Sequence, residues 1–279
     1  MTSSDRPSDF RLETDEGLSA SGDLLGKTAI VTGGSRGIGS AICLALAARG
    51  AQVAVNCRRE SLLAEGVATS VNGFGCRAKV VQADVSDRDA VLRMVEDVSS
   101  SLGTPDILVN NAGVFHSGHL LRYSEEEFDR MWRVNVKGVL HCCEAAAPAM
   151  IAKGWGRIVN VASNAAVGTA MAGTTLYAAT KGAVLSLTRR MAFELSPKGV
   201  TVNAVLPGMI ETDMVTSGKT PSQLEELFRD VAGRALLGRV GMPAEIAALT
   251  GFLCSPKSSY MTGQFLMADG GRRDYLSHV

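Results

Sequence analysis

The sequence predicts an α/β protein, a single doubly wound domain in which helices cover both faces of one parallel, seven-stranded sheet. Short apolar runs rich in β-branched residues alternate along the chain with longer segments whose apolar residues recur at helical spacing. No linker rich in Pro, Gly and Ser, no internal repeat and no low-complexity stretch interrupts this alternation. We therefore expect one domain over residues 25–279, preceded by a flexible tail over residues 1–24.

Seven segments are apolar enough to be strands buried on both faces of such a sheet. In chain order they are residues 28–32, 52–56, 78–83, 107–110, 157–162, 201–205 and 264–267. Apolar residues recur at helical spacing in several of the segments between them, which predicts helices there; among these are residues 39–49, 87–102, 125–153 and 177–196. Residues 208–235 follow the end of a strand, where ligand clefts of doubly wound sheets lie, so they are predicted to form a lid over the substrate; a surface excursion without a role is the alternative.

Charge and composition favour a small molecule as the main partner. The 28 basic and 28 acidic residues give a formal net charge of zero, which removes the electrostatic reason to expect nucleic acid or an anionic membrane. No apolar run is long enough to predict a membrane span, and the polar first residues are unlike a leader. The six cysteines include no C-x-x-C pair and are expected to be buried reduced thiols, which favours the cytoplasm.

The turn between the first strand and the first helix has the composition of a phosphate-binding site. It runs Gly33-Gly-Ser-Arg-Gly-Ile-Gly39, and glycine lets backbone N–H groups and the positive end of a helix approach a pyrophosphate without a Cβ in the way. A plain tight turn is the alternative. The cofactor contacts expected within the turn are Gly33, Ser35, Arg36, Gly37, Ile38 and Gly39.

The end of the second strand indicates which nicotinamide cofactor is bound. A carboxylate there would hold a free ribose 2′-hydroxyl and repel a 2′-phosphate, but the strand ends in Cys57 followed by Arg58. Arg36 of the glycine turn can approach the same point, and arginine forks suit phosphate oxygens. The sequence therefore predicts NADP(H), with NAD(H) as the alternative if Arg58 and Arg59 only begin a solvated helix.

The glycine spacing T-G-x-x-x-G-x-G, from Thr32 to Gly39, resembles that of the short-chain dehydrogenase/reductase family in its single-domain form. Asn110-Asn-Ala-Gly113 matches the family's N-N-A-G segment, and Tyr177-Ala-Ala-Thr-Lys181 matches its Y-x-x-x-K pair. The resemblance spans residues 25–272 and implies a Rossmann-type fold and an oxidoreductase that interconverts a ketone and a secondary alcohol. It implies the catalytic residues Asn135, Ser163, Tyr177 and Lys181, and further cofactor contacts at Asp84, Val85, Asn111, Ala112, Gly113, Tyr177, Lys181, Pro207, Gly208, Ile210 and Thr212.

The matched residues suit proton exchange with a substrate oxygen. A free Tyr has a pKa near 10 and exchanges a proton poorly at neutral pH. Lys181 lies one helical turn from Tyr177, so its ammonium is expected to lower the pKa of the phenol. Ser163 is expected to hydrogen-bond the substrate oxygen as charge develops on it. It precedes Tyr177 by one position more than is usual in the family, so the loop between them is expected to carry an extra residue.

The resemblance also implies roles for Lys181 and Asn135 in addition to their place near the tyrosine. It implies that Lys181 holds the nicotinamide ribose and that Asn135 joins a water relay from Lys181 to solvent. An asparagine that only satisfies helix hydrogen bonds is the alternative for Asn135.

The substrate is less closely specified. Residues 207–214 and 263–271 look most like those of 3-oxoacyl-carrier-protein reductases, so the first expectation is a reductase of an acyl thioester or another small-molecule ketone. A sugar, polyol or cyclic-alcohol dehydrogenase of the same family is the close alternative. A catalytically silent NADP-sensing protein is the alternative from another class. The helical segments 125–153 and 177–196 are apolar on more than one side, which predicts a homotetramer or a homodimer.

Two other features have simple structural interpretations. His116 and His119 are three residues apart, a spacing that can place two imidazoles on one metal, but no third ligand recurs around them. The two histidines are therefore expected to form either a wall of the substrate pocket or plain surface, and no metal site is predicted. The acidic run at residues 125–127 follows Ser124, which is typical of a capped helix start.

Overall fold

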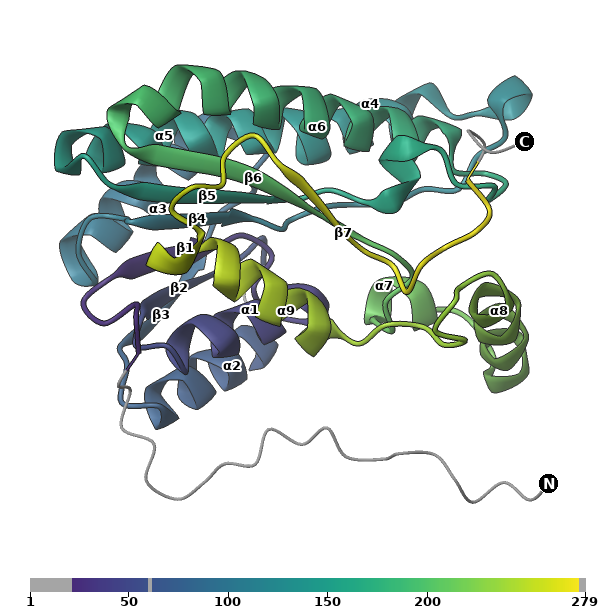
Figure 1. The fold of residues 1–279 in the computed structure, drawn as a ribbon, viewed down its shortest axis with the longest axis horizontal. Helices are drawn as coiled ribbons and strands as arrows, with labels where there is room; N and C mark the ends of the chain where they lie inside the picture. The colour runs from purple at the N-terminus through teal and green to yellow at the C-terminus, as the bar shows by residue number, and fades with distance from the viewer. Residues whose placement is uncertain (1–21, 60–61, 276–279) are drawn as a thin grey trace.

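Seven parallel strands form one sheet in the order β3-β2-β1-β4-β5-β6-β7, which confirms the predicted fold class (Figure 1). The structure is a computed structural model and describes residues 22–59 and 62–275. The strand order reverses between β1 and β4, so the ligand crevice of the fold opens at the carboxyl ends of these strands. The strands are β1 Thr28–Val31, β2 Gln52–Cys57, β3 Ala78–Gln82, β4 Ile107–Asn110, β5 Gly156–Val161, β6 Val200–Pro207 and β7 Phe265–Ala268.

Helices cover both faces of the sheet, and each set seals an apolar layer against it (Figure 1). Residues of α3, α5 and α6 pack on one face, and residues of α1, α2 and α9 pack on the other. The helices are α1 Gly37–Ala47, α2 Leu62–Gly73, α3 Arg88–Ser101, α4 Glu125–Trp132, α5 Gly138–Lys153, α6 Thr175–Leu195, α7 Asp213–Thr216, α8 Pro221–Gly233 and α9 Pro243–Leu253. Because both faces are covered, the inner strands are buried almost throughout. The edge strands β3 and β7 are only partly buried, so the expectation of burial on both faces is wrong for these two.

The folded part of the chain begins earlier than predicted. Most of the expected tail, residues 1–21, lies outside the described residues. Of its last residues, Asp23 pairs with Arg49 at 2.7 Å and Leu24 is fully buried. Leu24 joins the apolar layer beneath α1, so these two residues of the expected tail pack against the domain.

The helix predicted over residues 125–153 is not a single α-helix. Its start is as expected, since Ser124 caps α4 by accepting a hydrogen bond from Glu127 N at 3.3 Å. A π-helical turn, Arg133–Lys137, then separates α4 from α5. Asn135 lies in this turn, where its Oδ1 accepts from Val114 N at 2.8 Å and its Nδ2 donates to Val114 O at 2.9 Å. Single π turns of this kind are frequent at functional sites.

All six cysteines are buried, and no disulfide joins any of the residues that the structure describes. Burial raises the pKa of Cys143 and of Cys254 to about 12, so both remain thiols at neutral pH. Within residues 22–59 and 62–275, no helix has the length and the apolar character needed to cross a membrane.

Candidate active site

The glycine turn between β1 and α1 has a conformation that only glycine adopts without strain. Gly33 and Gly37 have φ angles of +63° and +55°, in the left-handed region that side chains disfavour. At Gly39 a Cβ atom would lie 2.2 Å from the carbonyl oxygen of Gly33, so no larger residue fits there. Asn56, in β2, anchors the turn: its Oδ1 accepts from Gly33 N at 3.3 Å, while its Nδ2 donates to two carbonyl groups at the end of β3.

The Asn-Asn-Ala-Gly segment after β4 is tied to the same turn. Thr32 Oγ1 accepts hydrogen bonds from Asn111 N and Ala112 N, both at 3.0 Å. The Asn111 side chain in turn donates to the carbonyls of Thr32 and Gly33, at 2.9 and 3.1 Å. The ends of β1 and β4 are thereby locked together at the point where the strand order reverses, which is where doubly wound sheets bind ligands.

Ser163 and Tyr177 meet beyond the carboxyl end of β5. Ser163 caps the short 3-10 turn Asn164–Val167, and its Oγ accepts a hydrogen bond from Ala165 N at 3.1 Å. Tyr177 lies in the first turn of α6, with its phenol close enough to the Ser163 hydroxyl for that group to act on the pKa of the phenol in the lowering direction. The additional position between the two residues therefore leaves them close together.

Lys181 lies one turn further along α6, with its ammonium group buried. Its Nζ donates to Val161 O at 2.8 Å and lies 5.8 Å from the centre of the Tyr177 ring. Burial lowers the pKa of Lys181 to about 8. Burial also raises the pKa of Tyr177 to about 12, although the Ser163 hydroxyl acts in the lowering direction.

The lowering of the Tyr177 pKa that we predicted from the neighbouring ammonium is thus wrong for this structure. Desolvation penalises the phenolate more than its neighbours stabilise it. The Lys181 ammonium directs a proton at the Val161 carbonyl and not at the phenol oxygen. At neutral pH the site therefore holds a protonated phenol beside a protonated amine.

Asn135 lies behind these residues and connects them. Its Nδ2 also donates to Thr180 Oγ1 at 3.1 Å, and the Thr180 hydroxyl donates to Tyr177 O at 2.8 Å. Together with its two bonds to Val114, this side chain joins the loop after β4 to α6. The amide thus fixes the spacing of the two elements that flank the tyrosine.

One cavity of about 700 Å³ joins the glycine turn to the tyrosine. Every residue predicted to contact the cofactor lines its wall, and so does Ser163. Asn135 is the one predicted site residue that does not line this cavity. The sequence motifs of four separate loops are therefore brought to a single site.

The segment after β6 supplies part of the same wall, which favours the lid interpretation over a surface excursion. Met209, Met214 and Leu227 of this segment line the cavity, the last two from α7 and α8. Phe115, which sequence analysis missed, places its ring edge-on to Tyr177, with centroids 5.2 Å apart. Its position just after the Asn-Asn-Ala-Gly segment is the signal that could have identified it.

The two histidines are outside this site. Phe115 and Ser117 line the cavity, whereas His116 and His119 do not. His116 Nδ1 instead lies 3.7 Å from a carboxylate oxygen of Glu127. Among the residues described, no three His, Cys, Asp or Glu side chains gather closely enough to hold a metal ion.

Comparison with known proteins places the chain in a family. Residues 33–273 match the family model described as enoyl-(acyl carrier protein) reductase. The chain is 41% identical over 246 residues to the 3-oxoacyl-(acyl-carrier-protein) reductase FabG of Staphylococcus aureus, covering 88% of this chain and 97% of the relative. It is 37% identical to versicolorin reductase 1 of Aspergillus parasiticus over 254 residues, which cover 88% of this chain and 96% of that protein.

Solved structures agree with these relatives. A short-chain dehydrogenase/reductase from Serratia marcescens superposes with a TM-score of 0.83 at 38% identity, covering 89% of this chain and 98% of that one. The fold and the site thus define an oxidoreductase that acts on a CH–OH group or the corresponding ketone. The protein belongs to the short-chain dehydrogenase/reductase family.

The wall of the cavity suits a nicotinamide dinucleotide. The turn from Gly33 to Gly39 leaves a cradle that a Cβ atom would fill, so backbone N–H groups at the start of α1 can approach phosphate oxygens. Lys181, whose ammonium is buried, lines the same cavity. Arg36 and Arg58 supply cations at the remaining corner of the wall.

Proposed function

We propose that the protein is an NADP(H)-dependent ketoreductase that acts on 3-oxoacyl thioesters or related apolar ketones. The observation that carries this proposal is that Ser163, Tyr177 and Lys181 line one cavity with the glycine turn. Apolar side chains, among them Phe115, Met171 and Met214, line the same cavity together with polar ones, which supports a ketone with an apolar part as the substrate. The 3-oxoacyl reductase named among the relatives supports the same class.

In the proposed reaction a ketone gains a hydride at carbon and a proton at oxygen. A reduced nicotinamide held in the cavity would supply that hydride. The Tyr177 hydroxyl gives the proton to the oxygen, and the Ser163 hydroxyl donates a hydrogen bond to it as negative charge develops. The Lys181 ammonium stabilises the phenolate left on Tyr177, which regains its proton from solvent through a water relay on the Asn135 side.

A spectrophotometric assay tests this proposal. NADPH or NADH is mixed with acetoacetyl thioesters, cyclic ketones and sugar-derived ketones, and the loss of reduced cofactor is followed. We expect turnover of the thioesters with NADPH. Turnover of sugars alone would favour the dehydrogenase of a sugar, polyol or cyclic alcohol. Binding of NADPH without turnover of any substrate would favour the sensing protein.

Arg58 is proposed to select NADP(H) over NAD(H). It lines the cavity, whereas its neighbour Arg59 does not. Replacing Arg58 with Ala should lower kcat/KM for NADPH by about ten- to hundredfold, since charge-assisted hydrogen bonds to the 2′-phosphate are lost. The rate with NADH should stay within about twofold of the wild type. Arg59→Ala is the matched control, and an equal loss in both variants would contradict the assignment.

We also propose that the chain assembles as a homotetramer, or as a homodimer if only one surface pairs. Two separate surfaces expose large apolar side chains: Phe193 of α6 is 71% exposed and Leu140 of α5 is 40% exposed, while Leu236 near β7 is 71% exposed. Such patches favour protein contacts. Light scattering at micromolar concentration should give four times the chain mass, and a monomer would contradict the proposal. We expect the assembly in the cytoplasm, without nucleic acid or membrane partners.

A further inference from the structure

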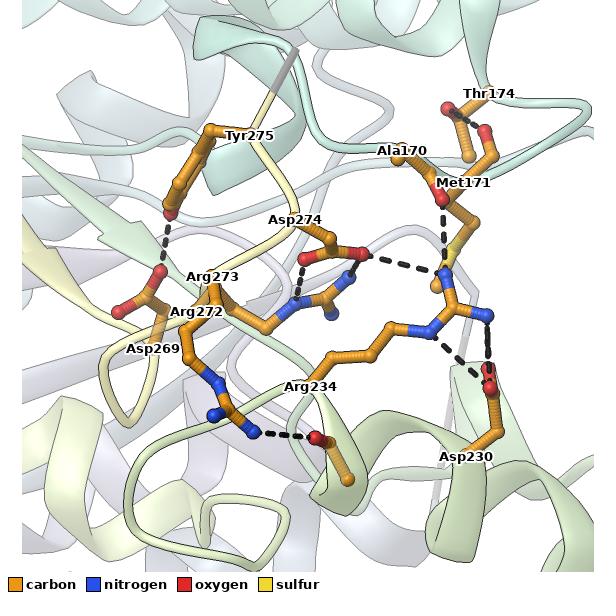
Figure 2. A network of polar contacts seen from close by, with 11 residues as sticks. Ala170, Met171, Thr174, Asp230, Arg234, Asp269, Arg272, Arg273, Asp274 and Tyr275 are labelled. Carbon is orange, nitrogen blue, oxygen red and sulfur yellow. Dashed lines mark hydrogen bonds and ion pairs between the residues drawn. The ribbon is translucent and has the colours of Figure 1, made fainter. Parts of the chain in front are cut away.

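Residues 270–275 lie beside the loop at Ala170 and beside Arg234, just after α8 (Figure 2). Arg272 pairs by a single antiparallel bridge with Ala235, just after α8, and Tyr275 pairs in the same way with Thr169. Thr169 belongs to the loop between Ser163 and Tyr177. This short segment therefore joins the lid to the loop that carries the catalytic serine and tyrosine.

Arg272 is the residue of this segment that reaches the cavity. It lines the cavity wall although its side chain is only 2% exposed. Its Nε and Nη2 donate to the two carboxylate oxygens of Asp274 at 2.6 and 2.5 Å. This ion pair lowers the pKa of Asp274, so the carboxylate stays ionised and holds the guanidinium in one orientation.

Asp274 is itself fixed from both sides (Figure 2). It accepts a further hydrogen bond from Arg234 Nη1 at 3.3 Å, and the same nitrogen donates to Ala170 O at 3.0 Å. The backbone oxygen of Asp274 accepts from Ala170 N at 2.8 Å. The orientation of Arg272 is thus set by a network that includes the lid and the catalytic loop.

The remaining nitrogen of the guanidinium has no partner in this network. Arg272 Nη1 donates no hydrogen bond to any residue within 22–59 or 62–275, and it is not among the atoms sealed from solvent without a partner. Its two N–H donors are therefore available on a residue of the cavity wall. Met171 and Leu227 line the same cavity, as do the polar side chains of Thr169 and Thr174.

A buried ion pair adds little stability compared with apolar residues of the same volume, so its place in the wall of the cavity is better explained by a role in recognition. We propose that Arg272 determines substrate specificity by donating a hydrogen bond from Nη1 to a second oxygen atom of the ketone substrate. This inference rests on the proposed ketoreductase function and narrows its substrates to ketones with another carbonyl or hydroxyl group nearby. The thioester carbonyl of a 3-oxoacyl substrate is such an oxygen.

The test compares the wild type with Arg272→Gln on two ketones of equal chain length. Ethyl acetoacetate has an ester carbonyl next to the methylene beside its ketone, and 2-heptanone has no second oxygen. With NADPH, the substitution should lower kcat/KM for ethyl acetoacetate by about ten- to hundredfold, as expected when a hydrogen bond from a charged donor is lost. For 2-heptanone the loss should be less than about threefold. Equal losses on both ketones, or no loss on either, would overturn the proposal.

Two further variants separate recognition from folding. Arg273→Gln is the matched control, since Arg273 donates to Gly233 O at 2.8 Å and lies outside the cavity wall; it should leave both rates unchanged. If Arg272→Gln is unstable because Asp274 is left without its partner, the double variant Arg272→Gln/Asp274→Asn removes the uncompensated charge. The double variant should show the same selective loss on ethyl acetoacetate, and an unselective loss counts against the proposal.

Calorimetric binding of the two ketones in the presence of NADP⁺ distinguishes this inference from the function on which it rests. If the wild type oxidises no NADPH but binds ethyl acetoacetate in a way that Arg272→Gln abolishes, the ketoreductase proposal fails and the role of Arg272 stands. If the wild type reduces both ketones and Arg272→Gln changes both rates equally or neither, the ketoreductase proposal stands and the role of Arg272 fails. A wild type that neither reduces nor binds ethyl acetoacetate overturns both.

Discussion

Replacing Tyr177 with Phe is expected to lower kcat for ketone reduction by about 10²- to 10⁴-fold, the contribution typical of a positioned general acid. The substitution removes the hydroxyl that lies near Ser163 and keeps the ring that packs edge-on against Phe115. The cavity should therefore keep its shape, and NADPH should bind within about twofold of its wild-type affinity. Steady-state rates and a fluorescence titration with NADPH measure the two quantities.

Tyr123→Phe is the control for this prediction. Tyr123 is 43% exposed, its hydroxyl donates to Glu125 at 3.1 Å, and it lies outside the cavity wall. Loss of that hydroxyl should leave kcat unchanged. A Tyr177→Phe enzyme that keeps more than about a tenth of the wild-type kcat would contradict the role of the phenol as proton donor.

The protonation states of the site agree with reduction as its neutral-pH reaction. Burial raises the pKa of Tyr177 to about 12, so the phenol holds its proton until an oxygen of greater basicity forms beside it. The alkoxide produced by hydride transfer is far more basic than a phenolate, so it takes that proton readily. Lys181, with a pKa lowered to about 8, is still mostly protonated at pH 7 and can stabilise the resulting phenolate.

The sequence predicts those parts of the molecule that depend on local pattern. Strands buried on both faces must be apolar throughout, and a turn such as Gly33 to Gly39 must be glycine where φ is positive or where a Cβ atom would meet backbone. These requirements leave a pattern that is visible without coordinates. The strands and the glycine turn were predictable for this reason, whereas the other residues of the cofactor wall followed from the resemblance to the family.

Features that depend on distant contacts were not predictable in this way. The π-helical turn at Asn135 forms around bonds to Val114, twenty-one positions earlier in the chain. The pKa of Tyr177 depends on how completely the surrounding elements exclude water, which a Y-x-x-x-K motif does not encode. Arg272 enters the cavity only because Asp274 and the lid hold it there, and neither lies in a recognisable motif.

Replacing Lys181 with Met is expected to have opposite effects on activity and stability. The substitution removes the cation that stabilises the phenolate of Tyr177, so kcat should fall by about a hundredfold or more. The folded-state pKa of Lys181 lies near 8, below its ordinary value of 10.5, because burial disfavours the charged form. At pH 7 that burial lowers the free energy of unfolding by up to about 3 kcal/mol. Removing the buried amine removes this penalty, but it also removes the hydrogen bond to Val161 O, which costs about 1 kcal/mol. The free energy of unfolding of the variant should therefore be higher than that of the wild type by about 2 kcal/mol.

The pH dependence separates this explanation from simple repacking. Between the folded-state pKa near 8 and the unfolded value of 10.5, the unfolded chain binds a proton at Lys181 that the folded protein does not. Wild-type stability should therefore rise with pH in this window, relative to Lys181→Met, by about 2 kcal/mol between pH 7 and pH 9.5. Urea unfolding at the two pH values measures the difference, with Lys198→Met as the control because Lys198 is exposed. If the stability difference between wild type and Lys181→Met is the same at both pH values, Lys181 is not the buried, titrating amine that the site requires.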